Sequence, residues 1–145
     1  MRPQSRKYSC GPAALRAALH MLGRRVTERA LIKHARTTPH SGTDEAGIVR
    51  AIEHYGLVPT PRLVRGAGQA WRWVRRQLGQ GRPVLLCTDK WSHWVCVVGS
   101  FGSCVLVFDP EVKRRYSGLR PYTYDELAKR WGVEGSYYGV SVRSH

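Results

Sequence analysis

The chain has 145 residues, 42% of them hydrophobic, which is enough for a core, and we expect a single domain over residues 1–145. It carries 24 Lys and Arg residues against 10 Asp and Glu residues, a formal net charge of +14. No stretch is long and apolar enough to span a membrane, and the basic N-terminus lacks the apolar core of a secretory signal. These features argue against a helical membrane protein and predict a cytoplasmic one.

The positive charge predicts an acidic partner, either an acidic peptide or protein substrate or a nucleic acid. An arginine-rich surface without a ligand explains the charge equally well, because net charge bears on association rather than on fold. The arginines are spread along the chain and no nucleic-acid-binding motif is present, so a peptide partner is slightly favoured.

The first helix is expected over residues 11–22, directly after Cys10. Its apolar residues fall on one stripe, and Pro12 suits its first turn because the missing N–H is not needed there. Cys10 therefore lies at a helix N-terminus, where free N–H groups and the helix dipole favour a thiolate. Gly11 leaves room for a substrate to approach the backbone. Taken alone, Cys10 is more simply interpreted as a small buried core residue.

Two more helices, an edge strand and a fourth helix follow. Thr27 is the expected cap of a helix that ends near Ala35, and Ser41 or Thr43 is the expected cap of the next one. The third helix buries one apolar face, and a strand with two prolines suits a sheet edge. The face consists of Ala46, Val49, Ile52 and Tyr55, the strand covers residues 57–64, and the fourth helix covers residues 71–78.

The second half of the chain changes to β-branched and aromatic runs. Two of these runs flank the loop 99–103 and predict a hairpin. A charged connection, a helix capped by Thr123 and a last strand complete the chain. In order, the expected elements cover residues 83–87, 93–98, 105–108, 111–118, 122–131 and 137–142. The pattern predicts an α+β fold with N-terminal helices packed on a mainly antiparallel sheet.

The hairpin supplies a partner for Cys10. Centring it on Phe101 places His93 opposite Asp109, on one face of the sheet. A carboxylate beside an imidazole fixes the tautomer of the ring and leaves the other ring nitrogen to deprotonate a thiol. The pairing depends on the loop, because a slip of one residue alters it. Considered singly, His93 is interpreted as an ordinary strand residue and Asp109 as a turn former.

Four residues thus form a candidate catalytic set. Cys10 is the nucleophile, His93 the base and Asp109 the residue that orients the base. Gln4 lies on the extended approach to the first helix, where its side-chain amide and the Cys10 N–H form a candidate oxyanion hole.

The other candidate residues lie on or near the hairpin. Trp91 and Trp94 flank His93 and either wall the substrate cleft or fill the core. The remaining cysteines form no CxxC pair, which indicates reduced thiols, and Cys87, His93 and Cys96 match no standard zinc spacing. We therefore expect no metal and no cofactor, and we interpret Cys87, Cys96 and Cys104 as core residues.

The spacing of these motifs resembles one peptidase family. Gln4, five further residues and then Cys10-Gly-Pro-Ala-Ala-Leu15 resemble the start of the C39 peptidases, papain-like enzymes best known as bacteriocin leader peptidases. Later segments resemble, in order, the middle helix, a strand entry, the His strand and the Asp strand of that family. These segments are Asp44 after a Gly-Thr step, residues 80–84, residues 93–99 and residues 107–110.

The resemblance implies a papain-like fold and a peptide or protein substrate with small residues at the cleavage site. It implies the same roles for Cys10, His93, Asp109 and Gln4. It supports papain-like cysteine chemistry more firmly than double-glycine leader cleavage, because no transporter segment follows and the motif does not explain the arginine content.

The leading interpretation is a cysteine peptidase that cleaves a peptide or isopeptide bond through a thioester on Cys10. A thiol acyltransferase or a deamidase shares the same acyl-enzyme, and the sequence does not separate these reactions. The other class is a non-catalytic basic module on this fold that binds nucleic acid or an acidic protein. The intact set of four residues argues against that module, which would not need them.

Overall fold

The structure is a computed structural model that describes residues 9–110 and 118–145. Three helices lead the chain and six strands follow, with two further helices between them. The helices are α1 (Cys10–Met21), α2 (Glu28–Ala35), α3 (Glu45–His54), α4 (Ala67–Gly79) and α5 (Tyr124–Trp131). The strands are β1 (Val58–Arg65), β2 (Val84–Thr88), β3 (His93–Phe101), β4 (Cys104–Phe108), β5 (Leu119–Thr123) and β6 (Ser136–Arg143).

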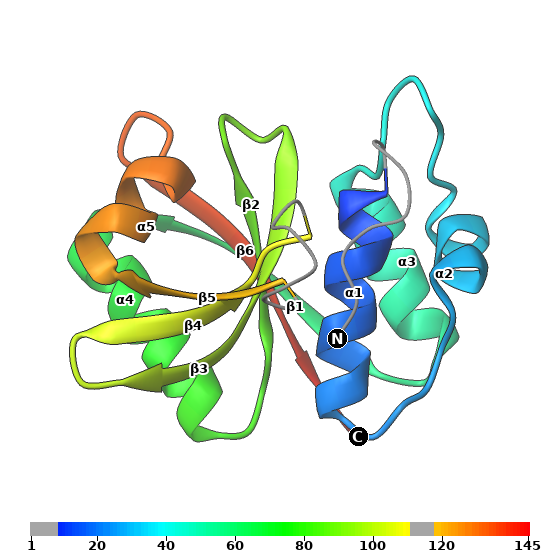
Figure 1. Ribbon diagram of the computed structural model, residues 1–145, viewed down its shortest axis with the longest axis horizontal. Helices are drawn as coiled ribbons and strands as arrows, with labels where there is room; N and C mark the ends of the chain where they lie inside the picture. The colour runs from blue at the N-terminus through cyan, green and yellow to red at the C-terminus, as the bar shows by residue number, and fades with distance from the viewer. Residues whose placement is uncertain (1–8, 111–117) are drawn as a thin grey trace.

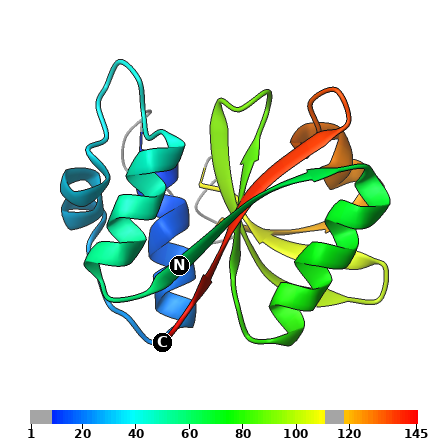
Figure 2. The same ribbon diagram turned by 180° about the vertical axis from the view of Figure 1, so that it is seen from behind.

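The strands form one antiparallel sheet in the order β1-β6-β2-β3-β4-β5. α1, α2 and α3 lie on one side of this sheet, and α4 and α5 on the other (Figure 1). β1 and β6 pair side by side and extend from the side of α1, α2 and α3 to the side of α4 and α5, as the view from behind shows (Figure 2). The α+β class and the helix-first order predicted from the sequence are confirmed, and so is the edge position of β1.

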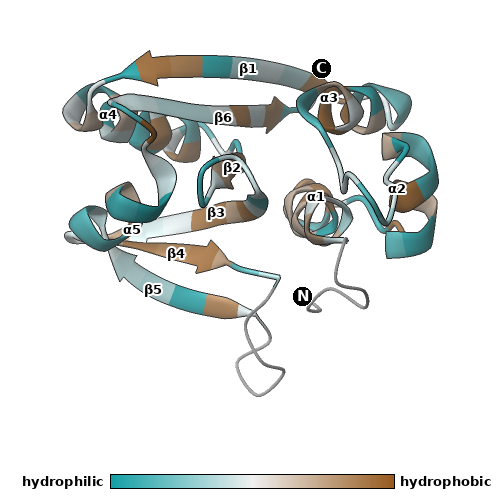
Figure 3. Cartoon of the chain, turned by 90° about the horizontal axis from the view of Figure 1, so that it is seen from above, coloured by the Kyte–Doolittle hydropathy of each residue, from teal (hydrophilic) through white to brown (hydrophobic). Residues whose placement is uncertain are grey.

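The sheet separates two hydrophobic clusters because successive strand residues point to opposite faces. In β3, Trp94 and Cys96 pack with α1, α2 and α3, whereas Val95 and Val97 pack with α4 and α5. Apolar residues accordingly appear on both sides of the curved sheet (Figure 3). Cys87 and Cys96 are buried as expected, but Cys104 is only half-buried at the hairpin end.

Two of the predicted helix caps are present and one is corrected. Thr27 accepts the N–H of Ala30 at 3.1 Å, and Thr123 forms a reciprocal capping box with Glu126. The cap of α3 is Asp44, not Ser41 or Thr43, and its carboxylate accepts the Gly47 N–H at 2.7 Å. The buried face of α3 also differs from the expected one, because helix residues at three- and four-residue spacing share a face. That face consists of Gly47, Ile48, Ala51 and Ile52.

Strand β5 was not predicted from the sequence: residues 119–121 were left unassigned, and Tyr122 and Thr123 were placed at the start of a helix. β5 is an edge strand, where Pro121 is tolerated because one side of the strand needs no donor. The expected connection 111–118 lies almost wholly outside the described residues.

The hairpin register differs from the expected one. β3 continues to Phe101, which pairs with Cys104, and the loop shrinks to residues 102–103. A bulge between Val97 and Gly99 then brings Val97 opposite Val107. The pairing beyond the bulge is displaced by two residues from the predicted one. A two-residue shift keeps every side chain on its predicted face, since the side-chain period of a strand is two.

Gly47 fixes the contact between α3 and α2. A Cβ atom there would overlap the Ala35 carbonyl oxygen and press on the Thr43 side chain. We expect Gly47→Ala to lower the free energy of unfolding by about 1–3 kcal/mol, measured by urea denaturation. Gly79→Ala is the control, because the structure leaves open space at Gly79 in a helix. Equal stability of the two variants would contradict this account of the contact.

Candidate active site

Cys10 is the first residue of α1 and is half-buried, directly after the buried residue Ser9. The helix start packs closely on the loop before α3, because a Cβ on Gly11 would lie 2.7 Å from the Thr43 side chain. Gly11 is therefore required for packing within the chain, and the space expected to admit a substrate at this residue is filled by Thr43. The first turn of α1 and the turn between β2 and β3 lie at the same end of the molecule (Figure 1).

His93 and Asp109 form a buried pair beside Cys10. The His93 Nε2 and Asp109 Oδ1 atoms are 2.8 Å apart, and each residue is 3% exposed. Asp109 follows the end of β4, and its N–H donates to the Gly118 carbonyl at 2.8 Å. The Cys10 side chain lies close enough to the His93 ring to contribute to its pKa. The remaining ring nitrogen, Nδ1, is the one available to Cys10.

Opposing effects set the pKa of His93. Burial lowers it, but the hydrogen bonds and charges of Asp109 and Cys10 outweigh burial and raise the pKa to about 10. The imidazole is therefore protonated at neutral pH. An imidazolium that faces a cysteine at a helix N-terminus is the arrangement found around reactive thiols.

Arg130 on α5 holds the other oxygen of Asp109. Its Nη1 donates to Asp109 Oδ2 and to the Tyr122 hydroxyl, both at 2.9 Å. Its Nε and Nη2 form a forked pair with Asp89 at 3.2 and 2.7 Å, and the Asp89 N–H donates to the Arg130 carbonyl at 2.8 Å. Burial opposes the ionisation of Asp89, but Arg130 outweighs it and holds the pKa of Asp89 below its usual range. The Asp109 carboxylate is thus fixed from both sides.

Arg130 and Asp89 were not predicted from the sequence as residues of the site. Arg130 is one of many arginines, and nothing in its local pattern distinguishes it. Its role arises only because the sheet brings α5 next to the turn between β2 and β3.

That turn is held in an unusual backbone conformation. Asp89, Lys90 and Trp91 have φ values of 52°, 56° and 66°, in the left-handed region that residues other than glycine rarely adopt. The ion pair of Asp89 with Arg130 and the Ser92 hydroxyl, which donates to the Asp89 carbonyl at 2.6 Å, fix the turn. Backbone strain of this kind persists where the surrounding structure enforces it, and it clusters at functional sites.

Trp91 and Trp94 both line a cavity of about 460 Å³ between the turn and the start of α3. Trp91 is 58% exposed. Trp94 is buried, and its indole N–H donates to the Thr43 carbonyl at 3.0 Å. Trp94 therefore belongs both to the core and to the cavity wall, so the two interpretations of this residue are compatible.

The structure brings Cys10, His93 and Asp109 together at one site. Gln4 lies outside the described residues, so its role as an oxyanion donor stays a prediction. Cys96 packs on the face of the sheet away from His93 and takes no part in this site.

For the peptide cleavage that the sequence resemblance implies, we expect Arg130→Met to reduce kcat/KM about 10–100-fold, because Asp109 loses the donor that fixes its second oxygen. Arg130→Lys should recover part of the activity. The alkaline limb of the pH profile should move to higher pH in Arg130→Met, since a cation near His93 is removed. Arg76→Met, at an exposed position of α4, is the control for loss of charge. A profile unchanged in both limbs would show that Arg130 only stabilises the fold.

Comparisons with known proteins assign the family. The sequence profile of the Peptidase_C39 like family matches residues 1–138. The chain belongs to this family. An uncharacterized protein of Methanothermobacter thermautotrophicus is 48% identical over 114 residues, which cover 77% of this chain and 71% of that protein.

The fold is also that of solved C39 peptidase domains. The peptidase domain of Streptococcus ComA, described as a bi-functional ABC transporter involved in quorum sensing, matches with a TM-score of 0.77 at 18% identity, over 99% of this chain and 97% of that domain. A double glycine motif protease from an AMS/PCAT transporter, solved with its leader peptide, matches with a TM-score of 0.72 at 17% identity, over 98% and 89%. The C39-like domain of a Vibrio parahaemolyticus toxin secretion protein matches with a TM-score of 0.64 at 13% identity, over 94% and 98%.

These structural matches confirm the papain-like C39 fold predicted from the sequence. Neither the family nor these structures support a nucleic-acid ligand. Among the described residues, no helix is long and apolar enough to cross a membrane.

Proposed function

We propose that this protein is a cysteine peptidase that cleaves a peptide or isopeptide bond through a thioester on Cys10. The observation that carries the proposal is the buried pair of His93 and Asp109 next to a cysteine at a helix N-terminus. The family assignment supports the same chemistry.

The proposed reaction has two steps. The Cys10 thiolate attacks the carbonyl carbon and forms a C–S bond, and the carbonyl electron pair moves to the oxygen. When the tetrahedral intermediate collapses, the C–N bond breaks and the His93 imidazolium gives its Nδ1 proton to the leaving amine. His93, now neutral, takes a proton from water, whose oxygen attacks the thioester carbonyl; the C–S bond then breaks, which releases the acid and regenerates the Cys10 thiolate and the His93 imidazolium.

Asp109 and Arg130 act on His93 rather than on the substrate. Asp109 accepts a hydrogen bond from the Nε2–H group and stabilises the imidazolium, while Arg130 fixes Asp109. The oxyanion needs donors, for which the Cys10 N–H and the Gln4 amide are the proposed groups.

The proposal is tested with a peptide pool digested by the wild-type protein and by Cys10→Ala, with mass spectrometry of the products. New N-termini that form only with the wild type are the expected result. Amide-to-acid conversion without chain cleavage would identify a deamidase, and new amide bonds to added amines would identify an acyltransferase. Equal product spectra for the two proteins would overturn the proposal and favour a non-catalytic module.

A further inference from the structure

The cavity that Trp91 lines lies next to the proposed nucleophile. Its wall includes Cys87, and burial, with the nearby Cys10 and Glu45 side chains, raises the pKa of the Cys87 thiol to about 12. Thr43, another wall residue, contacts the first turn of α1 at Gly11. A substrate bound at Cys10 therefore has a neighbouring side chain within reach of this cavity. The volume of about 460 Å³ is within the range of ligand pockets.

Exposed apolar side chains form one wall. Trp91 and Leu63, which line the cavity, are 58% and 57% exposed. Few large hydrophobic side chains are this exposed in the described part of the chain. The turn that carries Trp91 is fixed by the Asp89–Arg130 ion pair, so the backbone position of Trp91 at the cavity is fixed. Preorganised aromatic faces bind apolar chains and cations.

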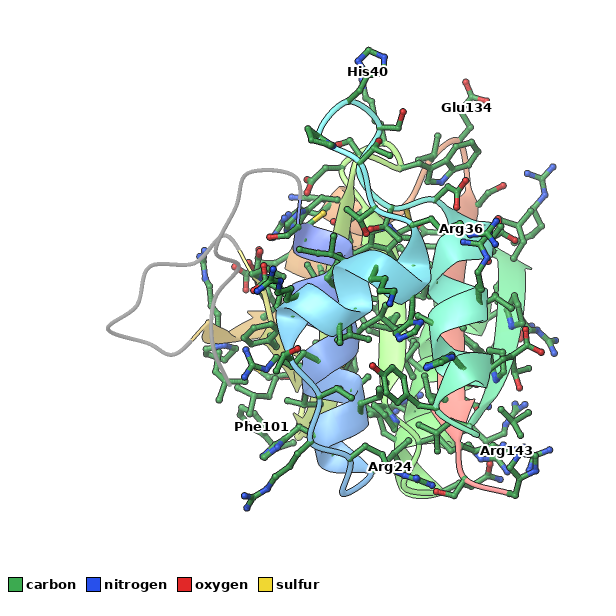
Figure 4. All side chains as sticks on the ribbon, turned by 90° about the vertical axis from the view of Figure 1, so that its right-hand side faces the viewer. Arg24, Arg36, His40, Phe101, Glu134 and Arg143 are labelled. Atoms are coloured by element: carbon green, nitrogen blue, oxygen red, sulfur yellow. The ribbon has the colours of Figure 1, made fainter. Side chains whose placement is uncertain are left out.

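Two other residues that line the cavity are acidic, whereas the chain as a whole has a net charge of +14. Asp44 and Glu45, at the start of α3, line the cavity, and no Lys or Arg is among its described wall residues. Lys90 lies next to Trp91 in the turn but not on the wall. One Asp44 oxygen accepts the Gly47 N–H, and the buried Tyr138 hydroxyl lies beside the Glu45 carboxylate, so burial and Glu45 raise the pKa of Tyr138. Arg24, Arg36 and Arg143, which Figure 4 labels on the helical side of the molecule, are not among the residues that line the cavity.

A cavity lined both by apolar and aromatic side chains and by two carboxylates is complementary to one class of side chain. A long aliphatic stem suits Leu63 and the tryptophan faces, and a terminal cation suits Asp44 and Glu45. An acidic side chain would be repelled, and a neutral apolar one would leave the carboxylates without a counter-charge. Resting on the peptidase function above, we propose that this cavity is a specificity subsite for a lysine or arginine side chain of the substrate, close to the scissile bond. The net positive charge alone suggested an acidic substrate, but the local charge at the cavity has the opposite sign.

The test uses peptides from the pool that are cleaved, resynthesised with Lys, Arg, norleucine or Glu at each position flanking the cleavage site. At one position, Lys or Arg should exceed norleucine in kcat/KM by about tenfold, and Glu should be the poorest. In Glu45→Gln and in Asp44→Asn the ratio of Lys to norleucine should fall towards one. Asn caps helices as well as Asp, so Asp44→Asn keeps the start of α3. Glu53→Gln changes an exposed residue near the other end of α3 and is the matched control; it should keep the wild-type kcat/KM for both the Lys and the norleucine peptides.

The outcomes separate this proposal from the peptidase function. Cleavage without a preference for a cationic residue at any position would overturn the subsite and leave the peptidase standing. A preference that persists in Glu45→Gln combined with Asp44→Asn would place the recognition outside the cavity and also overturn the subsite. If no peptide is cleaved in a Cys10-dependent manner, both proposals fall.

Discussion

His93→Ala should lower kcat/KM by roughly 10⁴-fold or more while the protein stays folded. In the structure His93 is the group placed to take a proton from Cys10 and to give one to the leaving amine. Members of a nucleophile–base unit act together, so removing one costs about as much as removing all of them. The measurement is kcat/KM on one cleaved peptide, together with the far-UV circular dichroism spectrum.

Two controls make this result specific. His40→Ala changes an exposed histidine at the tip of the loop between α2 and α3 and should keep the wild-type rate (Figure 4). Cys10→Ala combined with His93→Ala should be no slower than either single variant, since both remove the same unit. A folded His93→Ala protein with more than a tenth of the wild-type rate would show that another group acts as the base.

Asp109 should have the second largest effect, and its two variants separate orientation from charge. Asp109→Ala removes both and leaves the Arg130 cation near the ring, so we expect a loss of about 10³–10⁴-fold in kcat/KM. Asp109→Asn keeps a hydrogen-bonding group and should lose less activity. The measurement is kcat/KM against pH for both variants.

The pH dependence of kcat/KM shows whether Asp109 raises or lowers the pKa of His93. Asp109 contributes to the raised pKa of His93, so the wild-type rate should fall at alkaline pH as the imidazolium loses its proton near pH 10. In Asp109→Asn the alkaline limb should move to lower pH. An alkaline limb at the same pH in wild type and variant would contradict the assignment of Asp109 as the partner of His93.

The free energy of unfolding should also depend on pH through the raised pKa of His93. The folded pKa of His93, about 10, lies above its ordinary value of 6.5, so the folded state binds the proton more tightly. The stabilisation from this pair is therefore fully present below pH 6.5 and is lost as pH rises towards 10.

The sequence predicted that His93 and Asp109 lie together, although the hairpin register used for that prediction was wrong. The expected hairpin centre was wrong, yet Val95 and Val97 still lie on the face that the wrong register assigned to them. Asp109 reaches His93 from beyond the end of β4, not as its direct cross-strand partner. The alternation of residues along a strand thus predicts to which face of the sheet each side chain points, even where the predicted cross-strand pairs are wrong.

The groups that support the site could not be predicted from local patterns. Arg130 and Asp89 are far apart in the sequence and meet only in the folded sheet. The acidic residues of the Trp91 cavity likewise depend on how the fold brings the start of α3 close to β1 and to the turn between β2 and β3. Thr43 was expected as a helix cap, but it is the residue that packs on Gly11, and Asp44 caps the helix in its place.

The most direct test of the account is the site of alkylation under limiting iodoacetamide at pH 6, mapped by mass spectrometry. An ordinary thiol is almost fully protonated and slow at this pH, whereas a thiolate facing an imidazolium reacts. We expect the adduct on Cys10, with a much slower rate in His93→Ala. Modification of the half-buried Cys104 before Cys10, or a Cys10 rate that His93→Ala leaves unchanged, would contradict the central claim that Cys10 and His93 form one reactive unit.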